Sequence, residues 1–120
     1  MAVALFPGAF KPPTKGHFLA VKELATNTFK AAKFSTDAQN KSIMGTLRSG
    51  KAKDKVDKVL VIISNKARNG ISSNDSLKIW NIYKKYLPNN IEIMISPDAD
   101  PVRTALRLVK DNPDTNYLSG

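Results

Sequence analysis

Residues 4–17 read Ala4-Leu5-Phe6-Pro7-Gly8-Ala9-Phe10-Lys11-Pro12-Pro13-Thr14-Lys15-Gly16-His17, and this stretch decides the fold. The apolar run before Pro7 is short and begins at Ala2, which is typical of a strand buried on both faces. Pro12 and Pro13 exclude a regular helix before Thr14, and threonine is a good N-cap residue. The stretch therefore predicts a strand, a loop and a helix over residues 15–26. The N-terminus of that helix offers unpaired N–H groups to a phosphate.

The rest of the chain alternates strand and helix patterns. Apolar runs predict strands over residues 56–64 and 91–96, and residues 115–120 look like the start of a fourth strand. Ser72 or Ser73 is expected to cap a helix over residues 74–86, and Asp98 or Asp100 to cap the next one. Alternating strands and helices predict an α/β fold with right-handed parallel connections.

Apolar periodicity assigns the faces of these helices. The second helix places five large residues on one face for packing against the sheet: Ile79, Trp80, Tyr83, Tyr86 and Leu87. Trp80 is therefore interpreted as a core residue rather than as a stacking platform for a base. On the third helix, Arg103, Arg107 and Lys110 are expected to face solvent.

The first loop also carries a motif. The run from Phe6 to His17 resembles the G-x-F-x-P-x-H/T-x-G-H signature of the nucleotidyltransferase superfamily, which includes cytidylyltransferases and pantetheine-phosphate adenylyltransferases. The residues in register are Gly8, Phe10, Pro12, Thr14, Gly16 and His17. The resemblance implies a three-layer Rossmann-like (HUP-type) parallel sheet with helices on both faces. It also implies that the strands at residues 91–96, 56–64, 2–6 and 115–120 lie side by side in that order.

The resemblance implies an activity as well. A nucleotidyl group would pass from ATP or CTP to a phosphorylated small-molecule acceptor, with release of pyrophosphate and no covalent enzyme intermediate. Mg²⁺ would arrive with the nucleoside triphosphate, and no protein metal site is expected. The implied nucleotide-binding residues are Phe6, Pro7, Gly8, Ala9, Phe10, Thr14, Gly16 and His17. His17, Thr14 and Lys66 are the implied catalytic residues, and the pantetheine-phosphate enzymes are similar to this chain in having threonine at the position of Thr14.

Two of these assignments have structural alternatives. His17 shares a helical face with Ala20, Val21 and Leu24, so it is also placed to face the core. Thr14 is also a plain N-cap, and that role is compatible with a catalytic one. The glycines of the motif allow backbone to approach a phosphate or base closely.

A polar loop follows the second strand and supplies the implied acceptor-binding residues. Ligands in open α/β sheets bind outside the carboxyl ends of the strands, where this loop begins. The loop resembles one that carries a basic residue toward the acceptor phosphate in the family, so Lys66 and Arg68 are candidates, with Lys11 of the first loop. Ordinary solvated charge is an equal alternative for Lys66 and Arg68.

Composition limits the other classes of function. The 120 residues predict a single domain, 1–120, and the absence of cysteine with only one histidine excludes thiolate and histidine-rich metal sites. The formal net charge of +9 favours a polyanionic partner. Residues 28–55 form a basic insertion that we interpret as a solvated loop rather than a nucleic-acid patch, because aromatic residues are sparse there.

The sequence leaves several alternatives open. We expect a cytoplasmic protein without membrane contact, because the chain shows neither a long apolar span nor a signal core. The family's later I-S-S-T-x-x-R segment is absent, so the C-terminal part of the family domain is expected to be missing. That absence also permits a catalytically inactive nucleotide-binding or structural protein, or a basic nucleic-acid-binding module. A homo-oligomer is left open.

Overall fold

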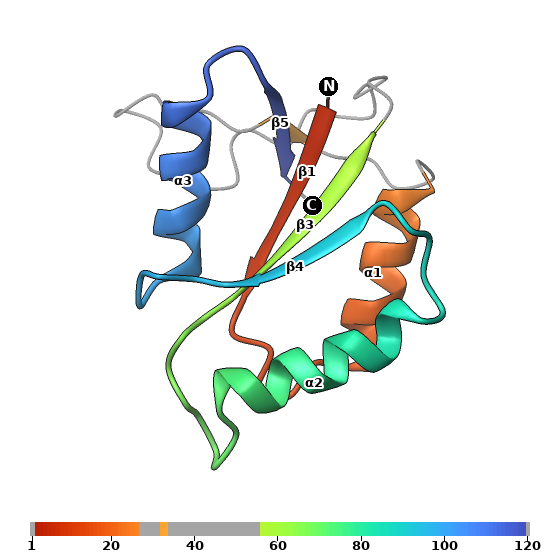
Figure 1. Cartoon of the computed structure of the whole chain (residues 1–120), viewed down its shortest axis with the longest axis vertical. Helices are drawn as coiled ribbons and strands as arrows, with labels where there is room; N and C mark the ends of the chain where they lie inside the picture. The colour runs from red at the N-terminus through yellow and green to blue at the C-terminus, as the bar shows by residue number, and fades with distance from the viewer. Residues whose placement is uncertain (1, 27–31, 34–55, 120) are drawn as a thin grey trace.

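The computed structural model describes residues 2–26, 32–33 and 56–119 (Figure 1). The helices and strands follow one another in this order: β1 (Ala2–Gly8), α1 (Lys15–Ala25), β2 (Ala32–Lys33), β3 (Lys58–Ile63), α2 (Ser73–Lys84), β4 (Ile91–Ile95), α3 (Pro101–Asp111) and β5 (Asn116–Ser119). The predicted basic insertion lies outside the described residues, except for β2.

The strands form one sheet in the order β2-β5-β1-β3-β4. β5, β1, β3 and β4 pair with one another in parallel, which confirms the predicted α/β fold and the predicted order of these four strands. The two-residue strand β2 was missed, and it pairs antiparallel with β5 at the edge. The prediction of a purely parallel sheet was therefore wrong at that edge. Two residues are too few to carry an alternating pattern.

The central strand β1 is buried on both faces, as its continuous apolar run predicts. Ala2 and Ala4 belong to the core cluster on the side of α1 and α2, whereas Val3 and Leu5 pack on the side of α3. The molecule thus has three layers, with α1 and α2 on one face of the sheet and α3 on the other (Figure 1).

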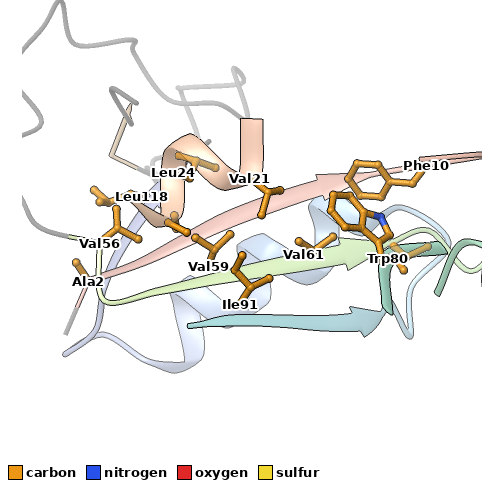
Figure 2. Packing of buried hydrophobic residues seen from close by; sticks show 13 residues of the cluster. Ala2, Phe10, Val21, Leu24, Val56, Val59, Val61, Trp80, Ile91 and Leu118 are labelled. Atoms are coloured by element: carbon orange, nitrogen blue, oxygen red, sulfur yellow. The ribbon is translucent and has the colours of Figure 1, made fainter. Parts of the chain in front are cut away.

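The larger core cluster joins β1 and β3 to α1 and α2. Figure 2 shows its side chains closing over the sheet, with Phe10 and Trp80 together at one end. Trp80 is fully buried, which confirms its interpretation as a core residue. Tyr86 was expected on the same packing face and is instead 73% exposed. The helix ends at Lys84, so helical spacing no longer governs where Tyr86 points.

Each helix in the described part of the chain is preceded by an N-cap residue. Thr14 caps α1, Ser72 caps α2, and Asp100 caps α3 with Pro101 at the first helical position. Each of these N-cap residues is therefore one of the candidates predicted from the sequence. Within the residues that the structure describes, no helix has the length and apolar character needed to cross a bilayer.

Candidate functional site

The loop after β1 is held by its own aromatic side chain. Phe10 has a φ of 52°, a left-handed conformation that is uncommon for residues other than glycine. Its carbonyl accepts a hydrogen bond from the hydroxyl of Ser76, a buried residue of α2. Its ring packs edge-on against Trp80 with ring centroids 5.2 Å apart. Phe10 was predicted to bind nucleotide, but only 4% of it is exposed, so it supports the loop from inside the core.

Gly8 explains how the ring of Phe10 fits. A Cβ added to Gly8 would lie 2.7 Å from Cζ of Phe10 and 2.9 Å from Cε1. The missing side chain at Gly8 therefore makes room for the ring of Phe10, which is part of the protein. Gly16 has no such neighbour, since an added Cβ would meet Oγ1 of Thr14 at 3.6 Å, an ordinary contact.

His17 sits in the first turn of α1 and completes a capping box. Its Nδ1 accepts a hydrogen bond from the backbone N–H of Thr14 at 3.0 Å, and its own N–H donates to Oγ1 of Thr14 at 3.4 Å. A neutral imidazole that accepts at Nδ1 carries its proton on Nε2. Burial of the ring against Phe10 lowers the pKa of His17 below its usual 6.5, so the neutral form is favoured.

The same hydrogen bond decides what His17 can do. Nε2–H is a donor at the helix N-terminus, and no described residue accepts from it. The helix N-terminus itself adds the positive end of the helix dipole and backbone N–H groups. The α1 N-terminus therefore offers directed donors for an anion, and the capping role of Thr14 coexists with that property.

Lys11 lies on the other side of the loop from Phe10. It is 8% exposed, and its Nζ donates to the carbonyls of Ala9 at 2.7 Å and Ser64 at 2.9 Å. The ammonium thus joins the loop after β1 to the end of β3. Burial, with a smaller contribution from the charge of Arg68, lowers the pKa of Lys11 below its usual value.

A pocket of about 260 Å³ opens at the carboxyl ends of β1, β3 and β4. It is lined by Ala9, Lys11, Ser64, Lys66, Arg68, Ala99, Asp100 and Pro101. The three residues predicted to bind the acceptor phosphate, Lys11, Lys66 and Arg68, thus line the same pocket. Lys66 and Arg68 are exposed, and within the described ranges their side chains form no ion pair.

The structure does not bring every predicted residue to this pocket. His17, Thr14 and Gly16 lie at the start of α1 and are not among its lining residues, and Phe6 stacks on Phe10. Pro7 and Gly8 end β1 beneath the loop, and only Ala9 of the predicted nucleotide-binding set reaches the pocket. The predicted site therefore has two parts, the α1 N-terminus and the basic pocket.

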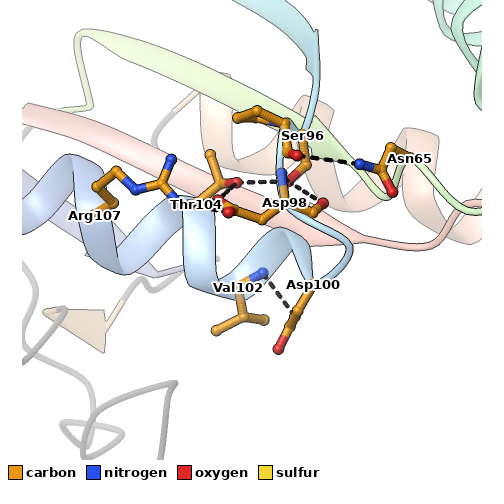
Figure 3. Close-up of polar contacts among 8 residues, drawn as sticks. Asn65, Ser96, Asp98, Asp100, Val102, Thr104 and Arg107 are labelled. Carbon is orange, nitrogen blue, oxygen red and sulfur yellow. Dashed lines mark hydrogen bonds and ion pairs between the residues drawn. The ribbon is translucent and has the colours of Figure 1, made fainter.

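Sequence reasoning missed the third wall of the pocket, the loop between β4 and α3. Figure 3 shows the polar contacts that hold it. Oγ1 of Thr104 donates to Asp98 at 2.7 Å, and Nη2 of Arg107 lies 2.5 and 2.6 Å from the two oxygens of Asp98. These bonds, that of Thr104 first, lower the pKa of Asp98 below its usual 3.8. Arg107 was predicted to face solvent, and it is exposed, but it also pairs with this carboxylate.

The end of β3 ties this loop to the pocket. Oγ of Ser64 donates to the carbonyl of Ala99 at 3.1 Å and accepts from the N–H of Lys66 at 3.3 Å. Asn65 donates to the carbonyl of Pro97 (Figure 3). The sequence feature that could have indicated these contacts is the short polar run that directly follows the apolar strand β3.

Metal binding by the protein itself was not predicted. Across residues 2–26, 32–33 and 56–119, no three acidic or histidine side chains gather to hold a cation. Asp98 is engaged by Thr104 and Arg107, and Asp100 caps α3.

Comparison of the chain with protein-family models, with curated proteins and with solved structures finds no match. The functional argument therefore depends on the geometry of the chain itself.

Proposed function

We propose that this chain is a nucleotidyltransferase, which moves a nucleotidyl group from ATP or CTP to a phosphorylated small molecule and releases pyrophosphate. The observation that carries the proposal is the capping box of α1, because it leaves Nε2–H of His17 as a directed donor at a helix N-terminus. A basic pocket at the carboxyl edge of the same sheet supports it. A HUP-type sheet, Mg²⁺ carried by the triphosphate and a cytoplasmic location belong to the same proposal.

In this proposal the two parts of the site hold the two substrates. The α-phosphate of the triphosphate lies at the N-terminus of α1, where His17 donates to the charge that develops on its oxygens. The phosphate of the acceptor lies in the basic pocket, held by Lys66 and Arg68 over the buried ammonium of Lys11.

The chemistry then needs only positioning and charge. An oxygen of the acceptor phosphate attacks the α-phosphorus, and the bond to the bridging oxygen of pyrophosphate breaks. A phosphate nucleophile needs no base, because it is ionised at neutral pH. Catalysis in such a reaction comes from alignment and from donors aimed at the transferred group.

The test uses two substitutions that keep the capping box. Glutamine and glutamate at the third helical position both accept from the cap N–H, but only glutamine also carries N–H donors. We expect His17→Glu to remain folded and to lose pyrophosphate release by about 100-fold or more, and His17→Gln to lose less. The assay supplies Mg²⁺, ATP or CTP and a set of phosphorylated acceptors. Equal turnover by His17→Glu and the unaltered chain would refute the role of His17.

The same assay separates the proposal from a non-catalytic protein. Nucleotide binding without pyrophosphate release, in the presence of every acceptor, would show a binding module with this fold. The net charge of +9 favours one further candidate, a nucleic-acid-binding module. RNA or DNA binding that weakens steeply with salt would indicate that function.

A further inference from the structure

A two-residue turn follows Arg68, which lines the basic pocket. Arg68 and Ile71 exchange two backbone hydrogen bonds of 2.9 Å each, so the turn between them consists of Asn69 and Gly70 alone. Both turn residues have a positive φ, 55° and 74°, as a two-residue hairpin turn of type I′ requires. In the whole sequence, a glycine directly follows an asparagine only at this turn.

The reactive groups of this turn are open to solvent. Asn69 and Gly70 are both exposed, and a Cβ placed on Gly70 would meet no heavy atom within 4 Å. Among the contacts of the described residues, no hydrogen bond engages the side-chain amide of Asn69 or the backbone N–H of Gly70. The amide carbon of Asn69 and the backbone nitrogen of Gly70 are therefore accessible to each other.

The chemistry of such a pair needs only hydroxide and water. The nitrogen of Gly70 gives its proton to hydroxide and attacks Cγ of Asn69. The N–Cγ bond forms, the Cγ–Nδ2 bond breaks, and the leaving nitrogen takes a proton from water and departs as ammonia. Water then opens the five-membered succinimide at either carbonyl, which leaves aspartate or isoaspartate at position 69. Glycine is the most favourable second residue, because it has no side chain to crowd the attacking nitrogen.

The other described asparagines are held in place or precede a bulkier residue. Three of them donate side-chain hydrogen bonds to backbone carbonyls: Asn65, Asn90 and Asn112. Three more lie within a helix or a strand: Asn74, Asn81 and Asn116. Asn89 is exposed in the turn before β4, but the next residue is an asparagine rather than a glycine. The structure thus favours reaction at Asn69 over the other described asparagines.

A carboxylate at position 69 acts on the pocket through Arg68. Lys11, Lys66 and Arg68 line the pocket together. Burial first, and the charge of Arg68 second, lower the pKa of Lys11 below its usual value, so the field of Arg68 extends over the pocket. A negative charge on the residue after Arg68 opposes that field, and isoaspartate also lengthens the backbone of the turn by one carbon.

We propose that Asn69 is a site of spontaneous deamidation, which places a carboxylate beside the basic pocket and weakens its affinity for anions as the protein ages. Each event lowers the net charge of the chain by one. The inference goes beyond nucleotidyl transfer, because it concerns the turn and the charge of the pocket, whatever reaction takes place there.

Ageing of the purified full chain at mildly alkaline pH tests the site. Peptides are analysed by mass spectrometry at intervals, since replacement of the amide by a carboxyl group adds about 1 Da. We expect position 69 to react about tenfold faster than Asn89 or more, because only Asn69 precedes a glycine. Gly70→Asn keeps a residue type that tolerates a positive φ but adds a side chain beside the nitrogen, so it should slow the reaction about tenfold. Equal rates at Asn69 and Asn89, or no slowing in Gly70→Asn, would refute the site.

Variants that carry the charge of the product test its effect on the pocket. Binding of inorganic phosphate is measured by NMR titration. We expect Asn69→Asp to lower the affinity about threefold at low salt and less at high salt, as for a charge that acts through solvent. Asn89→Asp makes the same change of charge at the amino end of β4, whereas the pocket lies at the carboxyl end, so it should leave the affinity unchanged.

The two variants decide between an effect on the pocket and a general effect of charge. A loss in Asn69→Asp without a loss in Asn89→Asp would support the inference. Equal losses in both variants, or no loss in Asn69→Asp, would refute the effect on the pocket. Failure of the unaltered chain to bind phosphate would also refute it, and with it the acceptor site of the proposed function.

Discussion

Gly8→Ala is expected to destabilise the protein through the ring of Phe10. The added methyl group would lie 2.7, 2.9 and 3.1 Å from Cζ, Cε1 and Cε2 of that ring. Favourable carbon–carbon contacts lie at about 3.5–4.0 Å, so the ring would have to move by about 1 Å. It has little room to do so, because His17 and Trp80 pack edge-on against it with centroids 4.8 and 5.2 Å away.

The magnitude follows from the cost of overpacking a dense core. Inserting a methyl group into a packed site typically costs about 1–3 kcal/mol. For a chain of this size, that corresponds to a melting temperature lower by roughly 4 °C for each kcal/mol. Alanine itself is compatible with the backbone at Gly8, since φ there is not positive. The whole effect is therefore assigned to the contact with the ring.

A double-mutant cycle measures how much of the cost of Gly8→Ala depends on the ring of Phe10. The three ring atoms nearest the added methyl group are all absent from leucine, so Phe10→Leu should remove most of the cost of Gly8→Ala. The free energy of unfolding is measured by urea denaturation for the unaltered chain, both single variants and the double variant. An equal cost of Gly8→Ala in both backgrounds would refute the argument, and would point to a requirement for glycine outside the ring contact.

Three further predictions concern single groups. Because the pKa of His17 lies below its usual 6.5, unfolding takes up a proton, so the free energy of unfolding should fall as pH drops below about 6.5 and stay level above it. Urea titrations should show no such fall in His17→Gln. Ser76→Ala leaves the carbonyl of Phe10 unpaired in the core and should cost about 1–3 kcal/mol, whereas Ser73→Ala in the same turn should cost less by the same measurement. Asp98→Asn should lower the melting temperature at neutral pH, and the difference from the unaltered chain should begin to shrink as pH falls below about 4, where the unfolded carboxyl takes up a proton, and vanish only below the lowered pKa of Asp98 in the folded protein. A difference that persists in acid would contradict the charge argument.

The sequence predicted the layers of the fold because each layer leaves a local signal. The apolar runs of β1 and β3 are long enough to indicate burial on both faces, and Thr14, Ser72 and Asp100 were candidate caps by residue type alone. β2 leaves no such signal, because two residues have no periodicity. Tyr86 was misplaced because helical spacing was continued past the end of α2.

The candidate site was predictable only in part. Lys11, Lys66 and Arg68 could be named because their loops resemble loops of the nucleotidyltransferase superfamily and follow strand ends, which parallel strands bring to one edge. The α3 wall was missed, because the pairing of Asp98 with Arg107 depends on how the β4–α3 loop folds back. Nor does any local pattern reveal that Lys11 is buried, since its partners include a carbonyl 53 residues away.

Phe10 and Lys11, which are neighbours in one loop, contact the two opposite sides of the sheet. These neighbours leave the same short loop in different directions, Phe10 into the cluster of α1 and α2, and Lys11 toward the pocket beside α3. The left-handed conformation at Phe10 is stabilised by the hydrogen bond from Ser76 and by the room above Gly8. Because the two residues are adjacent, we expect a change that moves the ring to disturb the ammonium as well. We therefore expect Gly8→Ala to weaken phosphate binding in the pocket as well as stability, although Gly8 does not line it. Phosphate affinity that is unchanged in a destabilised Gly8→Ala variant would show that the two sides of the loop are independent.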